Sequence, residues 1–227
     1  MADVYMMKVD TATNAQYHKL LSVTGDRKKK EVQNYKFRLD AVRSLAGEIM
    51  VRHILSQTCD MSEKEIHFVK NAYGKPFIKG CPNVHFNISH AGKWVVCAFD
   101  SHPIGIDIEK KEQIDLHIAD RFFANAEADA LYAQHETAQL DFFFRLWTLK
   151  ESYIKMIGRG LFIPLDSFSC DIMPNSCAFI KGEGHSIEAY LRWYDLDAGY
   201  KLAICQGKDR NPLAVYELSL NKLLGVQ

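Results

Sequence analysis

The sequence contains no pair of cysteines at the spacing of a metal site. Its six cysteines stand singly and no C-x-x-C occurs, which argues against structural zinc. A chain of 227 residues does not need a disulfide framework, so we expect buried free thiols in a reducing compartment. The nine histidines form no H-E-x-x-H pattern, and the usual zinc-hydrolase motif is therefore absent. The cysteines are Cys59, Cys81, Cys97, Cys170, Cys177 and Cys205.

An excess of one charge and a long apolar run are also missing. The 28 basic and 28 acidic side chains give a formal net charge of +0, which argues against a general nucleic-acid binder. No apolar run approaches the roughly 20 residues that a membrane helix needs. Residues 1–8 lack the pattern of a signal peptide. We therefore expect a cytoplasmic protein that binds neither nucleic acid nor membranes.

Helical and strand patterns occur in two successive blocks. Each block gives a helix-rich stretch followed by a run of strands, which indicates an α+β protein with two related halves. No linker of Ser or Gly separates them, so we expect tightly packed halves over residues 1–105 and 106–227. Helices are expected over 26–35, 40–57, 116–123, 126–134 and 140–157. Strands are expected over 4–9, 66–69, 84–89, 94–99, 104–109, 168–172, 187–194, 201–205 and 213–218.

Two acidic side chains alternate with isoleucines in the strand expected over 104–109. Because strand side chains alternate between faces, Asp107 and Glu109 share one face and Ile106 and Ile108 the other. Side chains two apart on a strand lie about 6.5–7 Å apart, close enough to converge on one hard cation such as Mg²⁺. The alternative is a solvated strand face opposite a buried one.

A second polar group follows on the helix expected over 140–157. Trp147, Glu151 and Lys155 are spaced i, i+4 and i+8 and therefore share one helix face. An ordinary i, i+4 ion pair of Glu151 with Lys155 would be worth about 0.3–0.5 kcal/mol, and Trp147 is expected to pack in the core. Three carboxylates on two rigid elements, with lysines beside them, favour instead a site for a divalent cation and the phosphates that it bridges.

Other candidate anion-binding residues stand in the first half. Ser89 and His90 end a strand, but adjacent strand side chains point to opposite faces and no G-x-S-x-G surrounds them, so a hydrolase nucleophile is disfavoured. Lys75 follows Gly74 in a turn that would let a ligand approach the backbone. We expect most of the basic side chains of residues 27–30 to be solvated at the surface, and one or two of them to reach a phosphate.

Four motifs in this order resemble the Sfp-type 4′-phosphopantetheinyl transferases. The similarity runs over nearly the whole chain and includes segments 121–123 and 164–168. It implies a pseudo-twofold monomer of two similar α+β halves, with coenzyme A in the cleft between them. The motifs are Tyr73-Gly74-Lys75-Pro76, Phe86-Asn87-Ile88-Ser89-His90, Gly105-Ile106-Asp107-Ile108-Glu109 and Trp147-Thr148-Leu149-Lys150-Glu151-Ser152-Tyr153-Ile154-Lys155.

The resemblance also implies roles for individual residues. One group would be the Mg²⁺ ligands, with Mn²⁺ as the alternative ion: Asp107, Glu109 and Glu151. A second group would hold the 3′-phosphate of coenzyme A: Lys28, Arg43, Ser44 and His90. A third would meet the adenine end: Tyr73, Gly74 and Lys75. The last would lie along the pyrophosphate: Ser89, Lys150 and Lys155. Glu31 departs from the family pattern, because a lysine is often found there.

The implied reaction is attack of a carrier-protein serine hydroxyl on the β-phosphorus of coenzyme A, the co-substrate, with release of 3′,5′-ADP. Lys155 would act on the phosphates, and Glu151 or a metal-bound water would take the serine proton; the sequence does not choose between these bases. The expected partners are apo carrier domains of peptide, polyketide or fatty-acid synthases, as in antibiotic biosynthesis. The segment 116–123, with its paired phenylalanines Phe122 and Phe123, is the candidate carrier-binding surface.

Three alternatives stay open. The transferase could be restricted to one fatty-acid or lysine-pathway carrier. A Mg²⁺-dependent hydrolase of nucleotide pyrophosphates would turn over coenzyme A with no protein acceptor. A non-catalytic module would bind coenzyme A and leave it intact.

Overall fold

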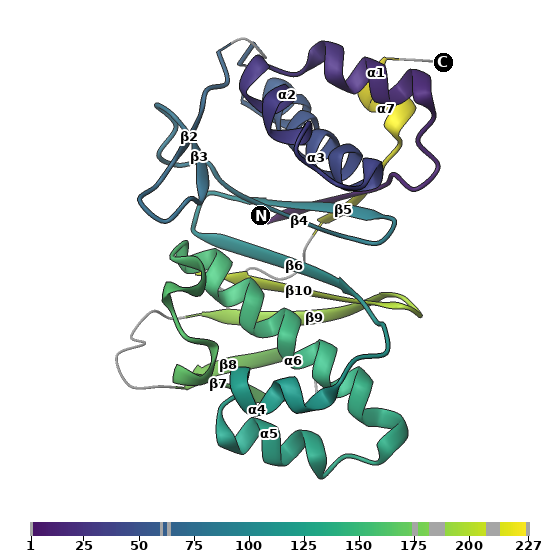
Figure 1. Cartoon of the computed structure of the whole chain (residues 1–227). Coiled ribbons are helices and arrows are strands. Elements are labelled where there is room, and N and C mark those ends of the chain that lie inside the picture. The colour runs from purple at the N-terminus through teal and green to yellow at the C-terminus, as the bar shows by residue number, and fades with distance from the viewer. Residues whose placement is uncertain are drawn as a thin grey trace.

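The computed structural model describes residues 2–59, 61–62, 65–173, 177–181, 189–207 and 214–225. Two β-sheets form its centre, and each carries one long helix (Figure 1). The expected α+β class with two halves is confirmed. None of the helices in this part of the chain is long and apolar enough to cross a membrane.

The first sheet has the strand order β11-β1-β5-β4. Helix α3 (Arg38–Thr58) packs on one face of it, because apolar side chains such as Val42, Leu45 and Ile49 recur along one side of the helix and are buried. Strand β1 pairs antiparallel with β5 and parallel with β11. The four strands are β1 (Asp3–Lys8), β4 (His85–Ala91), β5 (Trp94–Asp100) and β11 (Ala214–Leu218).

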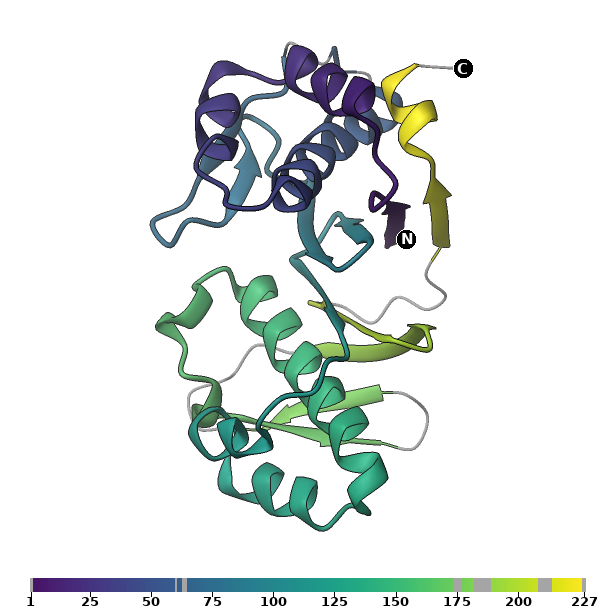
Figure 2. The ribbon, with the colours of Figure 1, turned by 45° about the vertical axis from the view of Figure 1, so that its right-hand side comes forward.

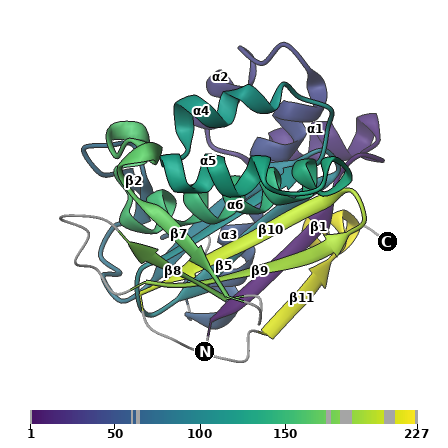
Figure 3. The same cartoon turned by 90° about the horizontal axis from the view of Figure 1, so that it is seen from below.

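The second sheet has the order β6-β10-β9-β8-β7. Helix α6 (Glu136–Ile157) lies against it, and the shorter helices α4 (Ala119–Phe122) and α5 (Asn125–Tyr132) lie on the same side (Figure 3). Helix α6 ends where expected, because Gly158 takes a left-handed φ of 79° and its N–H donates to the Ile154 carbonyl at 2.8 Å. The strands are β6 (Ile104–Lys110), β7 (Ser169–Ile172), β8 (Cys177–Lys181), β9 (Tyr190–Asp197) and β10 (Tyr200–Gln206).

The remaining elements lie outside the two large sheets and their long helices. They are α1 (Asn14–Val23), α2 (Asp26–Val32), the small hairpin of β2 (Phe68–Lys70) and β3 (Pro76–Ile78), α7 (Leu220–Leu224), and 3₁₀ turns at Leu116–Ile118, Gly160–Phe162 and Leu165–Ser167. The sequence patterns did not predict α1, β3, β8 or α7. A start signal for α1 was nevertheless present, because Thr13 and Gln16 form a capping box, S/T-x-x-Q. Of the expected strand residues, 187, 188 and 213 lie outside the described part.

The expected division into residues 1–105 and 106–227 needs two corrections. Its boundary cuts through β6, which pairs along its whole length with β10 of the second sheet. In addition, β11 and α7 follow the second half in sequence but return to the first half, where they lie beside β1 and α1 (Figure 2). The sequence does not reveal this return, because pairing between distant segments leaves no local pattern.

Side-chain oxygens join the two halves where β4 and β6 lie side by side (Figure 1). The backbone N–H of Ile106 donates to Asn87 Oδ1 at 2.9 Å, and that of Ile108 donates to Ser89 Oγ at 3.3 Å. The isoleucines of β6 pack into a core cluster shared with β1, β5 and β10. The expected alternation of isoleucines and carboxylates in this strand is therefore confirmed.

The cysteines of the described part agree with the expectation of free thiols. Cys97, Cys170 and Cys205 are buried, and Cys59 and Cys81 are partly exposed. The side chain of Cys177 lies outside the described residues.

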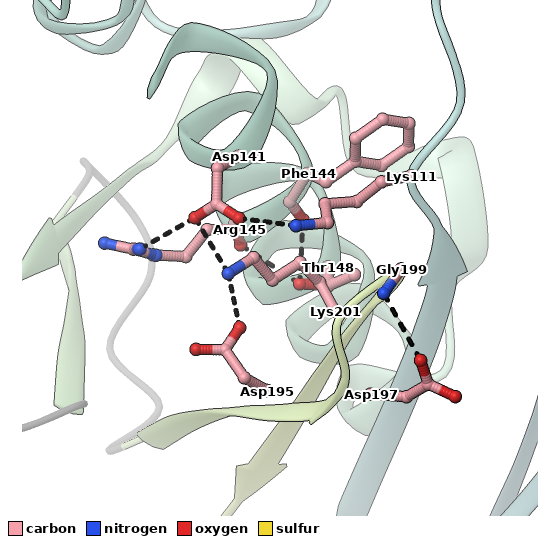
Figure 4. A network of polar contacts seen from close by, with 9 residues as sticks. All are labelled: Lys111, Asp141, Phe144, Arg145, Thr148, Asp195, Asp197, Gly199 and Lys201. Atoms are coloured by element: carbon pink, nitrogen blue, oxygen red, sulfur yellow. Dashed lines mark hydrogen bonds and ion pairs between the residues drawn. The ribbon is translucent and has the colours of Figure 1, made fainter. Parts of the chain in front are cut away.

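A polar network holds the beginning of α6 on the sheet (Figure 4). The Asp141 carboxylate of α6 forms ion pairs with Lys201 of β10 at 2.8 Å and with Lys111 at 2.9 Å. The buried Lys201 also pairs with Asp195 of β9. An ammonium group has three donor hydrogens, so Lys201 of β10 can pair with Asp141 of α6 and Asp195 of β9 at the same time. The first turns of the helix are thus attached to both strands.

A fully buried ion pair holds the middle of the same helix. Lys150 is 0% exposed, and its Nζ lies 2.6 Å from Glu127 Oε2 and donates to the Phe168 carbonyl at 2.6 Å. The carboxylate of Glu127 also accepts the backbone N–H groups of Cys170 and Ala124. Both charges are thus hydrogen-bonded on several sides, as a buried pair requires.

A glycine allows α6 to approach β6 closely. A Cβ on Gly105 would lie 1.9 Å from the Ser152 carbonyl oxygen and 2.5 Å from the Met156 nitrogen. Both obstacles are helix backbone, so no side-chain rotation could relieve the clash. The short distance between β6 and α6 therefore requires glycine, which has no side chain, at position 105.

We expect Gly105→Ala to destabilise the protein by at least the upper end of the roughly 1–3 kcal/mol typical of overpacking, because α6 must move away. Urea unfolding followed by circular dichroism measures this. Gly199→Ala is the matched control, since its Cβ would meet nothing within 4 Å. Equal stability of the two variants would contradict the role assigned to Gly105.

Lys150→Met should cost about 3–5 kcal/mol of unfolding free energy, because it leaves the Glu127 carboxylate charged and buried without its partner. Lys111→Met is the comparison, since its pair with Asp141 is partly exposed and such pairs are worth about 0–1 kcal/mol. A loss for Lys150→Met no larger than that for Lys111→Met would show that the buried pair is not what secures the helix.

Candidate functional site

A pocket of about 530 Å³ lies between the two halves, within the usual size range of small-molecule sites. The first half contributes residues of α2, α3, β2 and β4, and the second contributes β6 and α6. The structure brings ten of the expected site residues together in its lining: Lys28, Arg43, Ser44, Gly74, Ser89, His90, Asp107, Glu109, Glu151 and Lys155. Three others, Tyr73, Lys75 and Lys150, do not line it.

The second half supplies an acidic wall. Asp107, 2% exposed, accepts hydrogen bonds from Ser89 Oγ at 2.9 Å and from Lys155 Nζ at 2.5 Å. Lys155 Nζ also donates to Ser89 Oγ at 3.0 Å. Helix α6 and strands β4 and β6 thus meet in one hydrogen-bonded triangle at the bottom of the pocket. The Lys155 ammonium pairs with Asp107 across the elements rather than forming only a local helix contact.

The other two carboxylates of this wall are crowded. Burial and the neighbouring Asp107 carboxylate raise the pKa of Glu109 to about 7, although the Lys155 ammonium and a hydrogen bond from Trp147 act in the opposite direction. Burial and Asp107 also raise the pKa of Glu151. Trp147 packs in the core as expected, with its ring stacked on Phe143 at 5.7 Å, but it lines the pocket too. The wall therefore gathers three carboxyl groups around one lysine.

The first half supplies a mainly basic wall. Arg43 of α3 donates to the Gly92 carbonyl at 2.5 Å and pairs with Asp40, while its buried Nε has no hydrogen-bond partner. Burial and the Arg43 guanidinium lower the pKa of the nearby His90. Ser44 lies on the same helix, with its Oγ 3.3 Å from the Tyr35 hydroxyl.

Glu31, which departs from the family pattern, also lies in this wall. Lys28 Nζ is 2.6 Å from Glu31 Oε1. Although burial acts in the opposite direction, this hydrogen bond keeps the pKa of Glu31 below its usual value. Glu31 is therefore a carboxylate that competes with any bound phosphate for the Lys28 ammonium.

The turn between β2 and β3 reaches the pocket through its backbone. Gly74 lines the pocket, with a left-handed φ of 91° that favours glycine. The ring of Tyr73 is exposed and packs edge-on against Phe162, with ring centroids 5.2 Å apart. The side chain of Lys75 turns towards the end of α6, and burial lowers its pKa to about 8. Of the three residues expected at the adenine end, only Gly74 faces the pocket.

Lys150 needs a correction as well. It was expected along the pyrophosphate, but it is buried behind α6 against Glu127 and Phe168. The physical reason is helix geometry: one residue advances about 100° around an α-helix, so Lys150 cannot share the face of Glu151 and Lys155. Lys150 supports the helix and does not reach the pocket.

The carrier-binding segment is also corrected in part. Phe123 is 2% exposed and belongs to the core, and Phe122 packs on Trp147. The exposed apolar side chains are instead Ile118, within this segment, and Ile114, just before it. Phenylalanine is among the residue types most often buried.

Sequence reasoning missed several residues of the lining. Lys70 at the end of β2 adds a further cation, and Glu48 of α3 adds a carboxylate. Phe86 and Ile88 of β4 give the pocket an apolar side. Period-two alternation in β2 could have indicated Lys70, but a three-residue strand gives too short a pattern to separate the faces.

The residues present fit a hard divalent cation by their chemistry. Asp107 Oδ2 is buried and has no hydrogen-bond partner, and oxygen is the ligand that Mg²⁺ prefers. Glu109 and Glu151 add two carboxyl groups whose pKa values are raised, first by burial and then by the negative charge of Asp107. Within the described residues no three His, Cys, Asp or Glu side chains form a ready-made metal-binding group, so a cation would need side-chain rotation. The metal-ligand assignment stays a prediction.

Comparisons with known proteins agree with this arrangement of two halves. A family model described as the 4′-phosphopantetheinyl transferase superfamily matches residues 103–205, and one described as 4′-phosphopantetheinyl transferase, N-terminal, matches residues 11–102. The two matches meet at the beginning of β6, between the two sheets.

Relatives of similar length match nearly the whole chain. It is 40% identical over 206 residues to the 4′-phosphopantetheinyl transferase Sfp of Bacillus subtilis (strain 168), covering 91% of this chain and 92% of that protein. Identity is 38% over 206 residues to the 4′-phosphopantetheinyl transferase gsp of Aneurinibacillus migulanus, covering 90% of this chain and 86% of that protein.

A further relative matches over a shorter stretch. The human L-aminoadipate-semialdehyde dehydrogenase-phosphopantetheinyl transferase is 34% identical over 160 residues, covering 64% of this chain and 52% of that protein. The chain belongs to the 4′-phosphopantetheinyl transferase family.

Proposed function

We propose that this enzyme transfers the 4′-phosphopantetheine group from coenzyme A to a serine hydroxyl of an apo carrier protein, with Mg²⁺ bound and with release of 3′,5′-ADP. The observation that carries the proposal is one pocket with a basic wall from the first half and an acidic wall from the second. A nucleotide pyrophosphate with a divalent cation complements both walls, since phosphates favour cations and the cation favours carboxylates.

The basic wall binds the nucleotide. Lys28, Arg43, Ser44 and His90 take the 3′-phosphate, and the free Nε of Arg43 is one available donor. Gly74 lets the adenine approach the backbone, because no side chain stands in the way. Ser89 and Lys155 lie between the walls and hold the pyrophosphate.

The acidic wall would hold the cation, and one of its carboxylates accepts the proton of the serine hydroxyl. Asp107, Glu109 and Glu151 would hold Mg²⁺, which supplies neutralisation of the charge on the phosphoryl oxygens. The serine oxygen bonds to the β-phosphorus of coenzyme A while the bond from that phosphorus to 3′,5′-ADP breaks. The Glu151 carboxylate lines the pocket and accepts the serine proton, and the Lys155 ammonium stabilises the leaving phosphate.

The acceptors proposed for this chain are carrier domains of peptide, polyketide or fatty-acid synthases. The support is that relatives named Sfp and gsp match over most of both chains, whereas the human enzyme matches over half of its own length. The exposed Ile114 and Ile118 border a shallow apolar hollow that also touches Glu109 and Trp147, and this surface is the corrected candidate for carrier docking.

Incubation of an apo peptidyl carrier domain with the enzyme, coenzyme A and Mg²⁺ should raise the intact mass of the carrier by one phosphopantetheine group. Carriers with the acceptor serine changed to alanine are the control and should gain nothing. Apo carriers of fatty-acid and lysine pathways, tested in parallel, show whether the enzyme is restricted. Consumption of coenzyme A without any mass gain would instead indicate a hydrolase, and binding without consumption a non-catalytic module.

Asp107→Asn and Glu151→Gln should each lower the transfer rate by roughly 100-fold or more, because each removes a charge from the acidic wall. Initial rates at varied Mg²⁺ and calorimetric Mg²⁺ titration in the presence of 3′,5′-ADP measure the effect, with circular dichroism to check folding. Glu112→Gln is the matched control, since Glu112 is exposed and pairs with Lys110 outside the pocket. Full activity and unchanged Mg²⁺ binding in either pocket variant would remove that residue from the site.

A further inference from the structure

The ammonium group of Lys75 points away from the pocket and into the end of a helix. Its Nζ donates to the carbonyl oxygens of Lys155 at 2.6 Å, Met156 at 3.0 Å and Ile104 at 3.2 Å. An ammonium group has three donor hydrogens, so these contacts use all of them. Lys75 is therefore fully engaged before any ligand is present.

Two of these acceptors, the carbonyls of Lys155 and Met156, are groups that a helix end leaves unsatisfied, and the third, Ile104, begins β6. The last carbonyls of α6 have no partner within the helix, and a cation is favourable beside them because of the helix dipole. Lys75 supplies both the hydrogen bonds and the positive charge. Gly158 makes room for it, since a Cβ there would lie 2.7 Å from Lys75 Cδ.

A second side chain from the same turn binds the same helix end. Asn71 Nδ2 donates to the Gly158 carbonyl at 2.8 Å. Asn71 Oδ1 accepts the backbone N–H groups of Tyr73 and Lys75, both at 2.9 Å, and so fixes the turn that carries Gly74. Together, Asn71 and Lys75 form what we call the turn clamp.

The turn clamp connects the two walls of the pocket. On one side it holds the turn whose Gly74 lines the first wall, and on the other it holds the last turn of α6, whose Lys155 lines the second. The carbonyl of Lys155 is bound by the clamp while its ammonium reaches Asp107 and Ser89. A shift of this helix end would move the Lys155 side chain directly.

We propose that Lys75 is a positioning residue: it acts through the end of α6 and sets the distance between Gly74 on the nucleotide wall and Lys155 on the acidic wall, without touching coenzyme A itself. The proposal deepens the proposed function and rests on it, because the pocket is taken as the coenzyme A site. It replaces the position at the adenine end that the family resemblance implied for this residue.

The test is Lys75→Met, which keeps an unbranched apolar stem and removes the three donors. We expect kcat for transfer to an apo peptidyl carrier to fall roughly 10- to 100-fold, as small misplacements of reacting groups do, with the KM for coenzyme A within about threefold. Asn71→Ala should change kcat in the same direction. Lys79→Met, an exposed lysine beyond β3, is the matched control and should behave like the wild type. A raised KM with unchanged kcat would mean that Lys75 contacts the substrate and would overturn the proposal.

A double-mutant cycle identifies the residue through which Lys75 acts. If it acts through Lys155, adding Lys75→Met to Lys155→Ala should lower kcat no further, because the side chain being positioned is already gone. Independent, multiplicative losses from the two substitutions would overturn the proposed route.

Hydrogen exchange separates this proposal from the proposed function, since it needs no substrate. In Lys75→Met, backbone amides at the end of α6 should exchange roughly tenfold or more faster than in the wild type, while amides in the first turns of α6 stay unchanged. Unaltered exchange at the helix end would overturn the clamp even if transfer is measured. Absence of transfer in the wild type, with faster exchange in the variant, would overturn the proposed function and leave the clamp supported as a structural connection.

Discussion

The close contact between β6 and α6 at Gly105 determines the geometry of the whole site. The strand carries Asp107 and Glu109, and the helix carries Glu151 and Lys155, so the spacing of these elements is the spacing of the functional groups. A side chain at position 105 would meet helix backbone. Van der Waals contact, rather than any attraction between the site residues, therefore sets how near the carboxylates come to one another.

Such a gathering of carboxylates is unfavourable, and the chain compensates by fixing α6 from outside the pocket. Three lysines do this at different points along the helix: Lys201 at its beginning, Lys150 in its middle and Lys75 at its end. Each lysine donates to carboxylate or carbonyl oxygens outside the pocket. Repulsion between the carboxylates in the pocket does not weaken these contacts. The helix is thereby prevented from relaxing away from β6, which would relieve the crowding at the cost of the site.

The sequence predicted those parts of the site that depend on local periodicity. Alternation in β6 placed Asp107 and Glu109 on one face, and the i, i+4, i+8 spacing placed Trp147, Glu151 and Lys155 on another. The same helix periodicity, applied to Lys150, would have placed it away from Glu151 and Lys155. The orientation of Lys75 was not predictable, because local sequence does not show which distant oxygens an ammonium group reaches. The pairing of β11 with β1 was equally hidden, since it joins the two ends of the chain.

The opposite charges of the two walls also restrict what the pocket can bind well. A bare nucleotide would satisfy Lys28, Arg43 and His90 but would bring its phosphates against the carboxylates, and a lone cation would satisfy the carboxylates but not the basic wall. A phosphate-bound cation satisfies both at once. Because coupling between two ligands is reciprocal, each should then bind more tightly in the presence of the other. Glu31 weakens this preference, because its ion pair with Lys28 must break before the Lys28 ammonium can bind a phosphate fully.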